Sequence, residues 1–307
     1  MSKHVRLGID LGGTKTEIIA LTSDGDTLLR RRTPTPQGDY LSTIQNIVSL
    51  VNQAEAELEH KGSVGIAMPG AESPATGLIK NANSTWLNGK SFAQDLSEAL
   101  QRPIKLTNDA NCFALSEAID GAAQGAAIVF GVILGTGVGG GIVINQQTLT
   151  GINAISGEWG HNPLPWPQAG ELPGPPCYCG KYGCIETFLS GPALAQDYQG
   201  EDNLNGLEIA ERAEQGEAAA QDCLQRYVDR LARGLANVIN ILDPDVVVLG
   251  GGVSNIEKLY EAAPSQWDKY VFSDRVDTRL VKAKYGDSSG VRGAAWLWAP
   301  GEDAHIV

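Results

Sequence analysis

The sequence predicts an α/β fold built as two related lobes. An apolar run, a glycine turn and a second β-rich run occur at Leu7–Leu21 and again at Phe130–Ile144. A shift of 124 residues lays Gly13 on Gly137, so both segments are predicted to be β-hairpins with glycine-rich turns. Strands then alternate with helical patterns, which is typical of α/β architecture. We expect a smaller lobe at residues 1–118, joined by a C-terminal segment at about 289–307, and a larger lobe at 119–288.

Apolar residues at helical spacing predict where the helices lie. Tyr40–His60 and Ala218–Leu242 each carry such residues along one face, and Pro244 explains why the second helix stops. The run "VVVLGGG" predicts a buried strand that leads into glycines. Further helices are expected at Ser91–Gln101, Asn111–Ile119 and Ser289–Trp298, and irregular structure is expected at the Pro- and Gly-rich segment Pro163–Pro176.

Composition argues against nucleic acids and membranes as partners. The 307 residues carry a net charge of −13, whereas a nucleic-acid binder normally presents a basic face. The longest basic run, Arg30–Arg32, is expected to be a solvated strand end. The N-terminus shows no apolar region or cleavage site of a signal peptide, and no apolar run reaches the length of a membrane span. We therefore expect a cytoplasmic protein.

Three glycine-rich turns, each directly after a strong strand pattern, are candidate phosphate sites. Glycine lacks a Cβ, so backbone N–H groups in such turns can approach a phosphate closely. Any one of them could instead be an ordinary tight turn, but three in one chain favour a nucleotide site. The candidates are Gly12, Gly13, Thr14 and Lys15 in "DLGGTK", Gly135, Thr136 and Gly137 in "GTGVGGG", and Gly250, Gly251 and Gly252 in "LGGG".

Two better-known phosphate motifs do not fit these turns. Gly8 and Gly13 have the spacing of a P-loop, but Thr14 stands at the lysine position and no helix follows. Gly135, Gly137 and Gly140 match the Rossmann fingerprint, but that motif must open a helix, and the following "IVIN" is strand-like. The sequence therefore argues against a dinucleotide cofactor.

The remaining pattern, D-x-G-G-T-K in the first hairpin and G-T-G in the second, resembles the superfamily of sugar kinases, heat-shock ATPases and actin. The resemblance implies two ribonuclease-H-like lobes with ATP and the active site in the cleft between them. Asp10, which has no acidic counterpart in the second hairpin, would then act near Mg²⁺ through water, since Mg²⁺ keeps several waters. Alternatively, Asp10 stabilises its own turn, although an unpaired carboxylate in an apolar strand is costly.

Three of the five cysteines fall within "CYCGKYGCIE". Cys177, Cys179 and Cys184 are one ligand short of a tetrahedral zinc site, and His161 in "GEWGH" is the candidate fourth ligand. Such a Cys₃His set leaves no position for water or substrate, so the zinc would be structural. The alternative is three reduced cysteines packed in a loop.

The motifs "ILGTGVGGGIVIN", "GEWGH" and "CYCGKYGCIE" together resemble the ROK family of repressors, open reading frames and sugar kinases, over essentially the whole chain. Within it, "KNANSTWLNG" and "DSSGVRGAAWLW" are similar to bacterial manno(fructo)kinases. The resemblance implies an ATP-dependent hexose kinase that phosphorylates fructose, and also mannose, at O6. The alternatives are a glucokinase or an N-acetylhexosamine kinase of the same family.

The family resemblance also assigns roles to individual residues. Glu158, Glu186 and His161 would contact sugar hydroxyls, although each glutamate could instead support the zinc ligands. Asp109 would be the general base that accepts the proton of the attacking hydroxyl, with Asn108 and Asn83 on neighbouring hydroxyls. From the sequence alone, the position of "ND" before a helix favours an N-cap.

A ROK repressor is the alternative from a different functional class. Such repressors carry a helix-turn-helix domain before the first hairpin, whereas only nine residues precede Asp10 here. We expect a homodimer, because dimers are common among the relatives, with a hexose and ATP as its small-molecule partners.

Overall fold

The computed structural model describes residues 4–198, 204–299 and 302, which form two compact units. The first unit consists of Met1–Gly121, Gln146–Ser156 and Ser288–Val307, and the second of Ala122–Asn145 and Gly157–Asp287. Residues 300–301 and 303–307 of the predicted C-terminal segment lie outside the described part, as do residues 1–3 and 199–203.

The first unit is built on a five-stranded sheet with the strand order β3-β2-β1-β4-β7. β1 and β2 form the antiparallel hairpin that the sequence predicts, and β1 pairs in parallel with β4, which pairs in parallel with β7. The carboxyl ends of these three parallel strands therefore meet at one edge of the sheet. The strands are β1 (Val5–Leu11), β2 (Lys15–Leu21), β3 (Thr27–Pro34), β4 (Gly62–Met68) and β7 (Lys105–Asn108), beside the small pair β5 (Ala71–Glu72) and β6 (Ile79–Lys80) and the short β10 (Gln147–Thr148).

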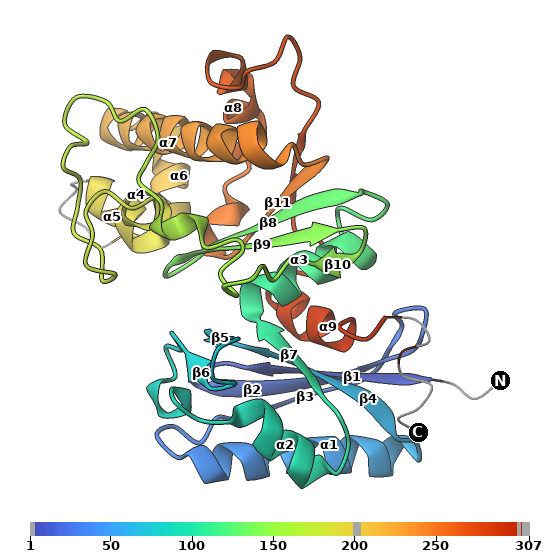
Figure 1. The fold of residues 1–307 in the computed structure, drawn as a ribbon. Coiled ribbons are helices and arrows are strands. Elements are labelled where there is room, and N and C mark those ends of the chain that lie inside the picture. Colours follow the sequence, from blue (N-terminus) through green and yellow to red (C-terminus); the bar gives the residue numbers. More distant parts are fainter. Residues whose placement is uncertain (1–3, 199–203, 300–301, 303–307) are drawn as a thin grey trace. The chain divides into compact units, whose positions relative to one another are not determined.

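Helices cover both faces of this sheet (Figure 1). α1 (Tyr40–Leu58) and α2 (Phe92–Leu100) pack on one face through a shared apolar core. On the other face, α9 (Ser289–Ala295) lies against β1 and β4, and α3 (Asp109–Ile119) packs against α9. Residues of β1 are buried because the strand is covered on both sides.

Glycines allow α9 to approach its neighbours at backbone distance. A Cβ on Gly8 of β1 would lie 2.1 Å from the carbonyl oxygen of Val291. On Gly65 of β4, a Cβ would lie 1.9 Å from the carbonyl oxygen of Ala294. Neither position has room for a side chain, so α9 packs directly on the strand backbones.

The second unit repeats the hairpin-and-helix plan. Strands β9, β8, β11 and β12 lie in this order, with β8–β9 antiparallel and β8–β11–β12 parallel. Apolar residues of β8 and β11 share one core with the amphipathic α7, which runs over the predicted residues. The elements are β8 (Ile128–Leu134), β9 (Val138–Ile144), β11 (Val246–Gly250), β12 (Arg279–Lys282), α4 (Glu186–Leu189), α5 (Gly191–Tyr198), α6 (Gly206–Glu214), α7 (Ala218–Leu242) and α8 (Leu259–Ala262).

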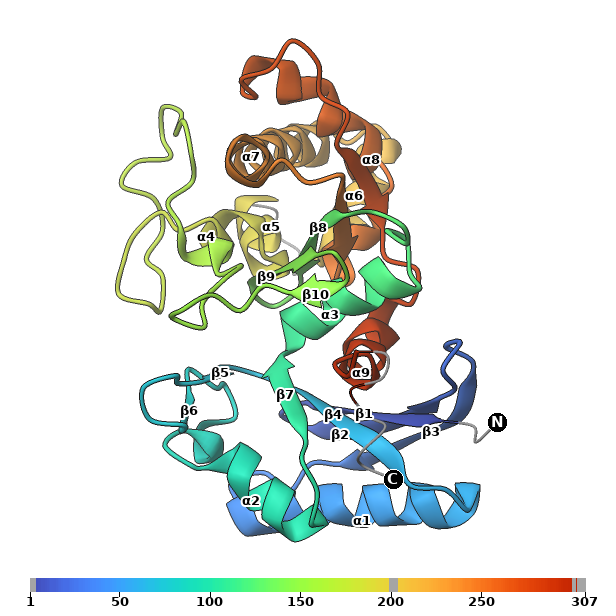
Figure 2. The same cartoon turned by 45° about the vertical axis from the view of Figure 1, so that its right-hand side comes forward.

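A long and largely irregular loop crosses the second unit between residues 157 and 185 (Figure 2). Its proline-rich part is held on α7 by buried ion pairs. Arg233 is 1 % exposed in its side chain and lies 3.0 Å from the Glu171 carboxylate and 2.9 Å from that of Asp229. It also donates to the carbonyl oxygens of Pro165 and Trp166. The arginine thus replaces the backbone hydrogen bonds that regular structure would have supplied.

The basic run is solvated, as expected, but it lies within β3 and not at the end of a strand. Arg30 and Arg32 lie in the middle of β3, where both side chains form ion pairs with the buried carboxylate of Glu17 on β2. Arg31 points to the opposite face of the sheet and pairs with Glu57 of α1. Alternation along a strand separates neighbouring side chains in this way.

Within the described residues, no helix is long and apolar enough to cross a bilayer.

Candidate active site

A pocket of about 430 Å³ opens at the edge where β1, β4 and β7 end. Ligand sites of open α/β sheets form at the carboxyl ends of parallel strands, because loops diverge there and leave a crevice. The pocket brings together Asp10, Gly12, Gly13, Thr14, Asn83 and Asp109, all of which the sequence marked as site residues. Leu11, Gln37, Pro69, Ser84 and Trp86 complete its lining.

The glycine turn in this pocket is held in shape from its outer side. The carbonyl of Lys15 accepts a hydrogen bond of 3.0 Å from the N–H of Gly12, while the side chain of Lys15 points to solvent. Thr35 donates to the carbonyl of Gly12 and Gln37 to that of Gly13. These bonds occupy the turn's carbonyl groups. Lys15, although predicted as a nucleotide contact, does not line the pocket.

Asn108 and Asp109 have different positions in the structure, one at the helix cap and one in the pocket, which the sequence alone could not distinguish. Asn108 is the N-cap of α3, and its Oδ1 accepts from the N–H of Ala110 at 2.9 Å. Its amide also donates to the carbonyl of Gly70 at 3.2 Å. Asp109 is the first residue of the helix and lines the pocket. The helix cap therefore rests on Asn108, and Oδ1 of Asp109 accepts from the same N–H of Ala110 at 2.8 Å.

Asp10 is perturbed by this arrangement. Burial and, to a lesser extent, the negative charges of Asp109 and Glu17 together raise the pKa of Asp10 to about 7, while Arg32 opposes the rise. Its Oδ2 lies 3.2 Å from where a Cβ on Gly290 would sit, so the start of α9 closes over it. Two nearby carboxylates in one pocket are typical of sites that bind a cation.

Sequence reasoning missed several residues of the pocket. Ser84 is 2 % exposed, and its Oγ has no hydrogen-bond partner within the described structure. Trp86 forms part of the wall and donates its indole N–H to Thr43 of α1. Both follow Asn83 in "NANSTW". An unpaired buried hydroxyl is rare in folded proteins, so Ser84 is suited to hydrogen-bond a ligand, but only the fold reveals that it is buried.

In the second unit, His161, Cys177, Cys179 and Cys184 form a compact cluster whose ligand atoms all lie within 4.8 Å of one another. The Sγ atoms of Cys179 and Cys184 are 3.6 Å apart, and Nδ1 of His161 is 3.5 Å from Sγ of Cys177. A tetrahedral zinc ion with bonds near 2.3 Å requires ligand separations of about 3.8 Å. The four residues therefore fit a structural zinc ion of the predicted Cys₃His type.

Nε2, the second ring nitrogen of His161, has a partner that the sequence did not suggest. It lies 2.9 Å from the hydroxyl of Tyr178, whose ring stands edge-on to the imidazole. Partial desolvation, with the carboxylates of Glu186 and Glu158 nearby, raises the pKa of Tyr178. The tyrosine thus occupies the ring nitrogen that His161 would need for the expected contact with a sugar hydroxyl. A metal-bound histidine usually donates its other N–H to such an acceptor.

The two other glycine turns lie side by side at the carboxyl ends of β8 and β11. A Cβ on Gly251 would lie 2.4 Å from the carbonyl oxygen of Leu134, the last residue of β8. Gly251 also has a φ of +82°, which favours glycine. Residues 135–137 and 250–252 are therefore brought together, as a shared phosphate site requires.

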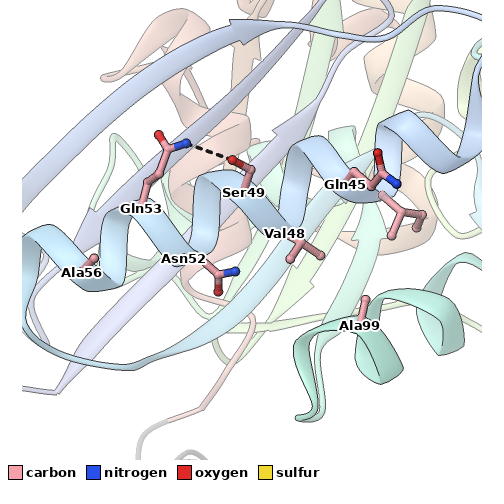
Figure 3. A pocket seen from close by; sticks show the side chains of 8 residues that line it. Gln45, Val48, Ser49, Asn52, Gln53, Ala56 and Ala99 are labelled. Atoms are coloured by element: carbon pink, nitrogen blue, oxygen red, sulfur yellow. Dashed lines mark hydrogen bonds between the residues drawn. The ribbon is translucent and has the colours of Figure 1, made fainter.

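A second hollow of the first unit lacks the chemistry of an active site. It has a volume of about 550 Å³ and runs along α1 towards Ala99 of α2 (Figure 3). Its lining is aliphatic or amide-bearing apart from Ser49, which accepts from Gln53 at 2.9 Å. No carboxylate, imidazole or thiol lines this hollow. The catalytic candidates thus belong to the pocket around Asp109.

Comparison with known proteins supports one family assignment. Residues 6–300 match the ROK family. An N-acetyl-D-glucosamine kinase of Photobacterium profundum is 42 % identical over 297 residues, which cover 94 % of this chain and 98 % of that protein. An N-acetyl-D-glucosamine kinase of Vibrio cholerae is 40 % identical over the same share of the two chains.

Solved structures agree with the fold. The ROK hexokinase of Thermus thermophilus is 32 % identical with a TM-score of 0.84, covering 95 % of this chain and 97 % of its own. A ROK family glucokinase from Streptomyces griseus, solved with glucose and AMPPNP, is 26 % identical with a TM-score of 0.74, covering 95 % and 98 %. The mixed α/β fold is therefore that of ROK sugar kinases in the actin-like ATPase superfamily.

We expect protein purified without added metal to contain about one zinc ion per chain, because the cluster supplies the four ligands of a closed Cys₃His site. Elemental analysis would measure it, and replacing Cys184 by serine should abolish it. Replacing Cys223 by serine is the matched control, since this buried cysteine lies outside the cluster. A folded, metal-free wild-type protein would contradict the assignment.

The raised pKa of Asp10 predicts a pH-dependent stability in the absence of divalent cations. Because the folded-state pKa is about 7 and the unfolded value 3.8, the folded protein holds a proton that the unfolded chain has lost. Stability is therefore lost as pH rises from 4 to 7. Asp10→Asn should match the wild type near pH 4 and exceed it by on the order of 4 kcal/mol at pH 8. Urea titrations across this range would measure the difference, and a constant gap between the two proteins would contradict it.

Proposed function

Because the chain belongs to the ROK family, we propose that it is an ATP-dependent sugar kinase whose substrate is N-acetyl-D-glucosamine, phosphorylated at O6. Relatives that span 94 % of the chain at 38–42 % identity are N-acetyl-D-glucosamine kinases. This similarity favours the N-acetylhexosamine alternative over the fructose preference that the sequence motifs suggested. The observation that carries the kinase proposal is the pocket in which Asp109 lies with Asp10 and the first glycine turn.

Asp109 is the proposed general base. The transition state of phosphoryl transfer is loose, so catalysis depends mainly on positioning and charge neutralisation. Asp109 would align the attacking hydroxyl and take its proton, with Asn83 and Ser84 offering further polar contacts from the same pocket wall. Asn108 would support this geometry through the cap of α3.

The glycine turns and Asp10 are proposed to serve the triphosphate. Backbone N–H groups of the turns at residues 12–14, 135–137 and 250–252 would stabilise phosphate charge. Mg²⁺ supplies further charge neutralisation when it is bound, and Asp10 would hold one of its waters. The raised pKa of Asp10 supports this role, because a cation would compensate its buried charge.

The second unit is proposed to contribute Glu158 and Glu186 to sugar recognition, while His161 holds the cluster with one ring nitrogen and meets Tyr178 with the other. Both carboxylates lie near Tyr178, whose hydroxyl meets His161. A structural zinc ion in the Cys₃His cluster would fix the segments that carry them. We also propose that the two units are the two lobes expected from the sequence.

A substrate panel tests the choice of sugar. We expect kcat/KM for N-acetyl-D-glucosamine to exceed that for glucose, mannose and fructose by about tenfold or more, because a site built to bind an amide group leaves polar atoms unpaired without it. An assay that couples ADP release to NADH oxidation would measure each rate. Highest activity on fructose would instead support the fructose preference that the sequence motifs imply. No activity on any sugar would overturn the kinase assignment.

Asp109→Asn separates the base from a structural role. Stability should be unchanged, because Asn108 caps the helix and an Asn at position 109 can still accept from Ala110. If Asp109 is the base, kcat should fall about 100-fold or more, with little change in KM for the sugar. Steady-state kinetics and thermal unfolding would show both. Wild-type turnover in a folded variant would falsify the assignment.

A further inference from the structure

The β8–β9 hairpin is contacted by two segments that lie next to the candidate zinc ligands in the sequence. On one side, Trp159 lies two residues before His161. Its indole N–H donates to the carbonyl of Gly139 in β9 at 3.1 Å. On the other, the N–H of Gly191 donates to the carbonyl of Gly135 at 2.8 Å. The turn's geometry therefore depends on how these two segments are held.

Glu186 makes the most direct of these contacts. Its Oε2 accepts the N–H of Val138 at 3.0 Å, at the end of the turn. Its Oε1 lies 4.0 Å from Sγ of Cys177 in the metal cluster. One carboxylate therefore joins the glycine turn to the cluster, at the first residue of α4 and two residues after Cys184.

Gly137 shows that this contact is built into the turn. A Cβ at this position would lie 2.6 Å from Oε2 of Glu186, closer than real Cβ atoms come to an oxygen. Gly137 does not have a positive φ, so its backbone conformation alone does not require glycine. The missing side chain makes room for the carboxylate of Glu186.

We propose that Glu186 is a positioning residue for nucleotide binding: it fixes the turn at residues 135–137 in the conformation that receives phosphate. This inference rests on the proposed kinase function and adds a second role to a residue so far expected only to contact the sugar. The contact occupies the N–H of Val138, so phosphate would meet the remaining N–H groups of the turn. A held turn binds more tightly, because less conformational freedom is lost on binding.

The nature of the contact makes the proposal specific. A negative charge beside phosphate is unfavourable by itself, so the benefit must come from accepting the hydrogen bond of Val138. Glutamine can accept the same bond without the charge, whereas alanine cannot. The two substitutions are therefore expected to have different effects. If only the charge of Glu186 mattered, both would have the same effect, because both remove it.

Binding of AMPPNP, measured by titration calorimetry with Mg²⁺ and without sugar, tests the proposal. We expect Glu186→Ala to raise Kd about tenfold, the effect of losing one such hydrogen bond. Glu186→Gln should stay within about twofold of the wild type. Glu158→Ala, the matched control, removes the other proposed sugar carboxylate but should leave nucleotide affinity unchanged.

Gly137→Ala gives an independent measurement, because it displaces the carboxylate without deleting it. Combined with Glu186→Ala, it should weaken binding less than the two single effects together, since both act through one contact. Unchanged affinity in Glu186→Ala, equal losses in the Gln and Ala variants, or full additivity with Gly137→Ala would each overturn the proposal. A wild-type protein that does not bind AMPPNP would instead overturn the proposed function itself.

Discussion

The direct packing of α9 against the sheet through glycine is the constraint on which the first unit depends. Gly8 and Gly65 leave no side chain between the strands and α9, and Gly293 does the same towards α3, where a Cβ would lie 1.7 Å from the carbonyl of Cys112. Backbones at this distance cannot slide past one another without a clash. The end of β1 and the start of α3 are thereby fixed, which places Asp10 and Asp109 in one pocket.

Holding two carboxylates together has an energetic consequence. The pKa of Asp10 is raised mainly because burial removes its carboxylate from water, and repulsion from the charge of Asp109 adds to this cost. Rigid glycine packing allows the fold to maintain an arrangement that a softer structure would relax. The same reasoning applies to Ser84, whose buried hydroxyl remains unpaired beside the glycine turn. Polar groups left unsatisfied in a pocket are available to a ligand.

In the second unit, side-chain contacts hold an irregular loop in place. Its loop at residues 157–185 has little regular structure, so side chains replace the missing backbone ladder. Arg233 holds the proline-rich part on α7, and the cysteine–histidine cluster draws together the segments on either side of it. Glu186 then links the cluster to the glycine turn of β8–β9. Order in this loop therefore comes from ion pairs and from the cysteine–histidine cluster rather than from strands.

The sequence by itself determined the elements and the residue types of the site. Apolar periodicity placed α1, α7 and both hairpins, and cysteine spacing with His161 gave the metal cluster, because these signals are local along the chain. Motif similarity gave the family but pointed to fructose, whereas the relatives favour the N-acetylhexosamine alternative, since specificity depends on a few contacts. Only the tertiary structure showed that Asn108, not Asp109, caps α3, that Tyr178 meets His161, and that Glu186 reaches Val138. The contacts of Tyr178 and Glu186 depend on how segments far apart in the sequence pack together, and local residue patterns do not encode this packing.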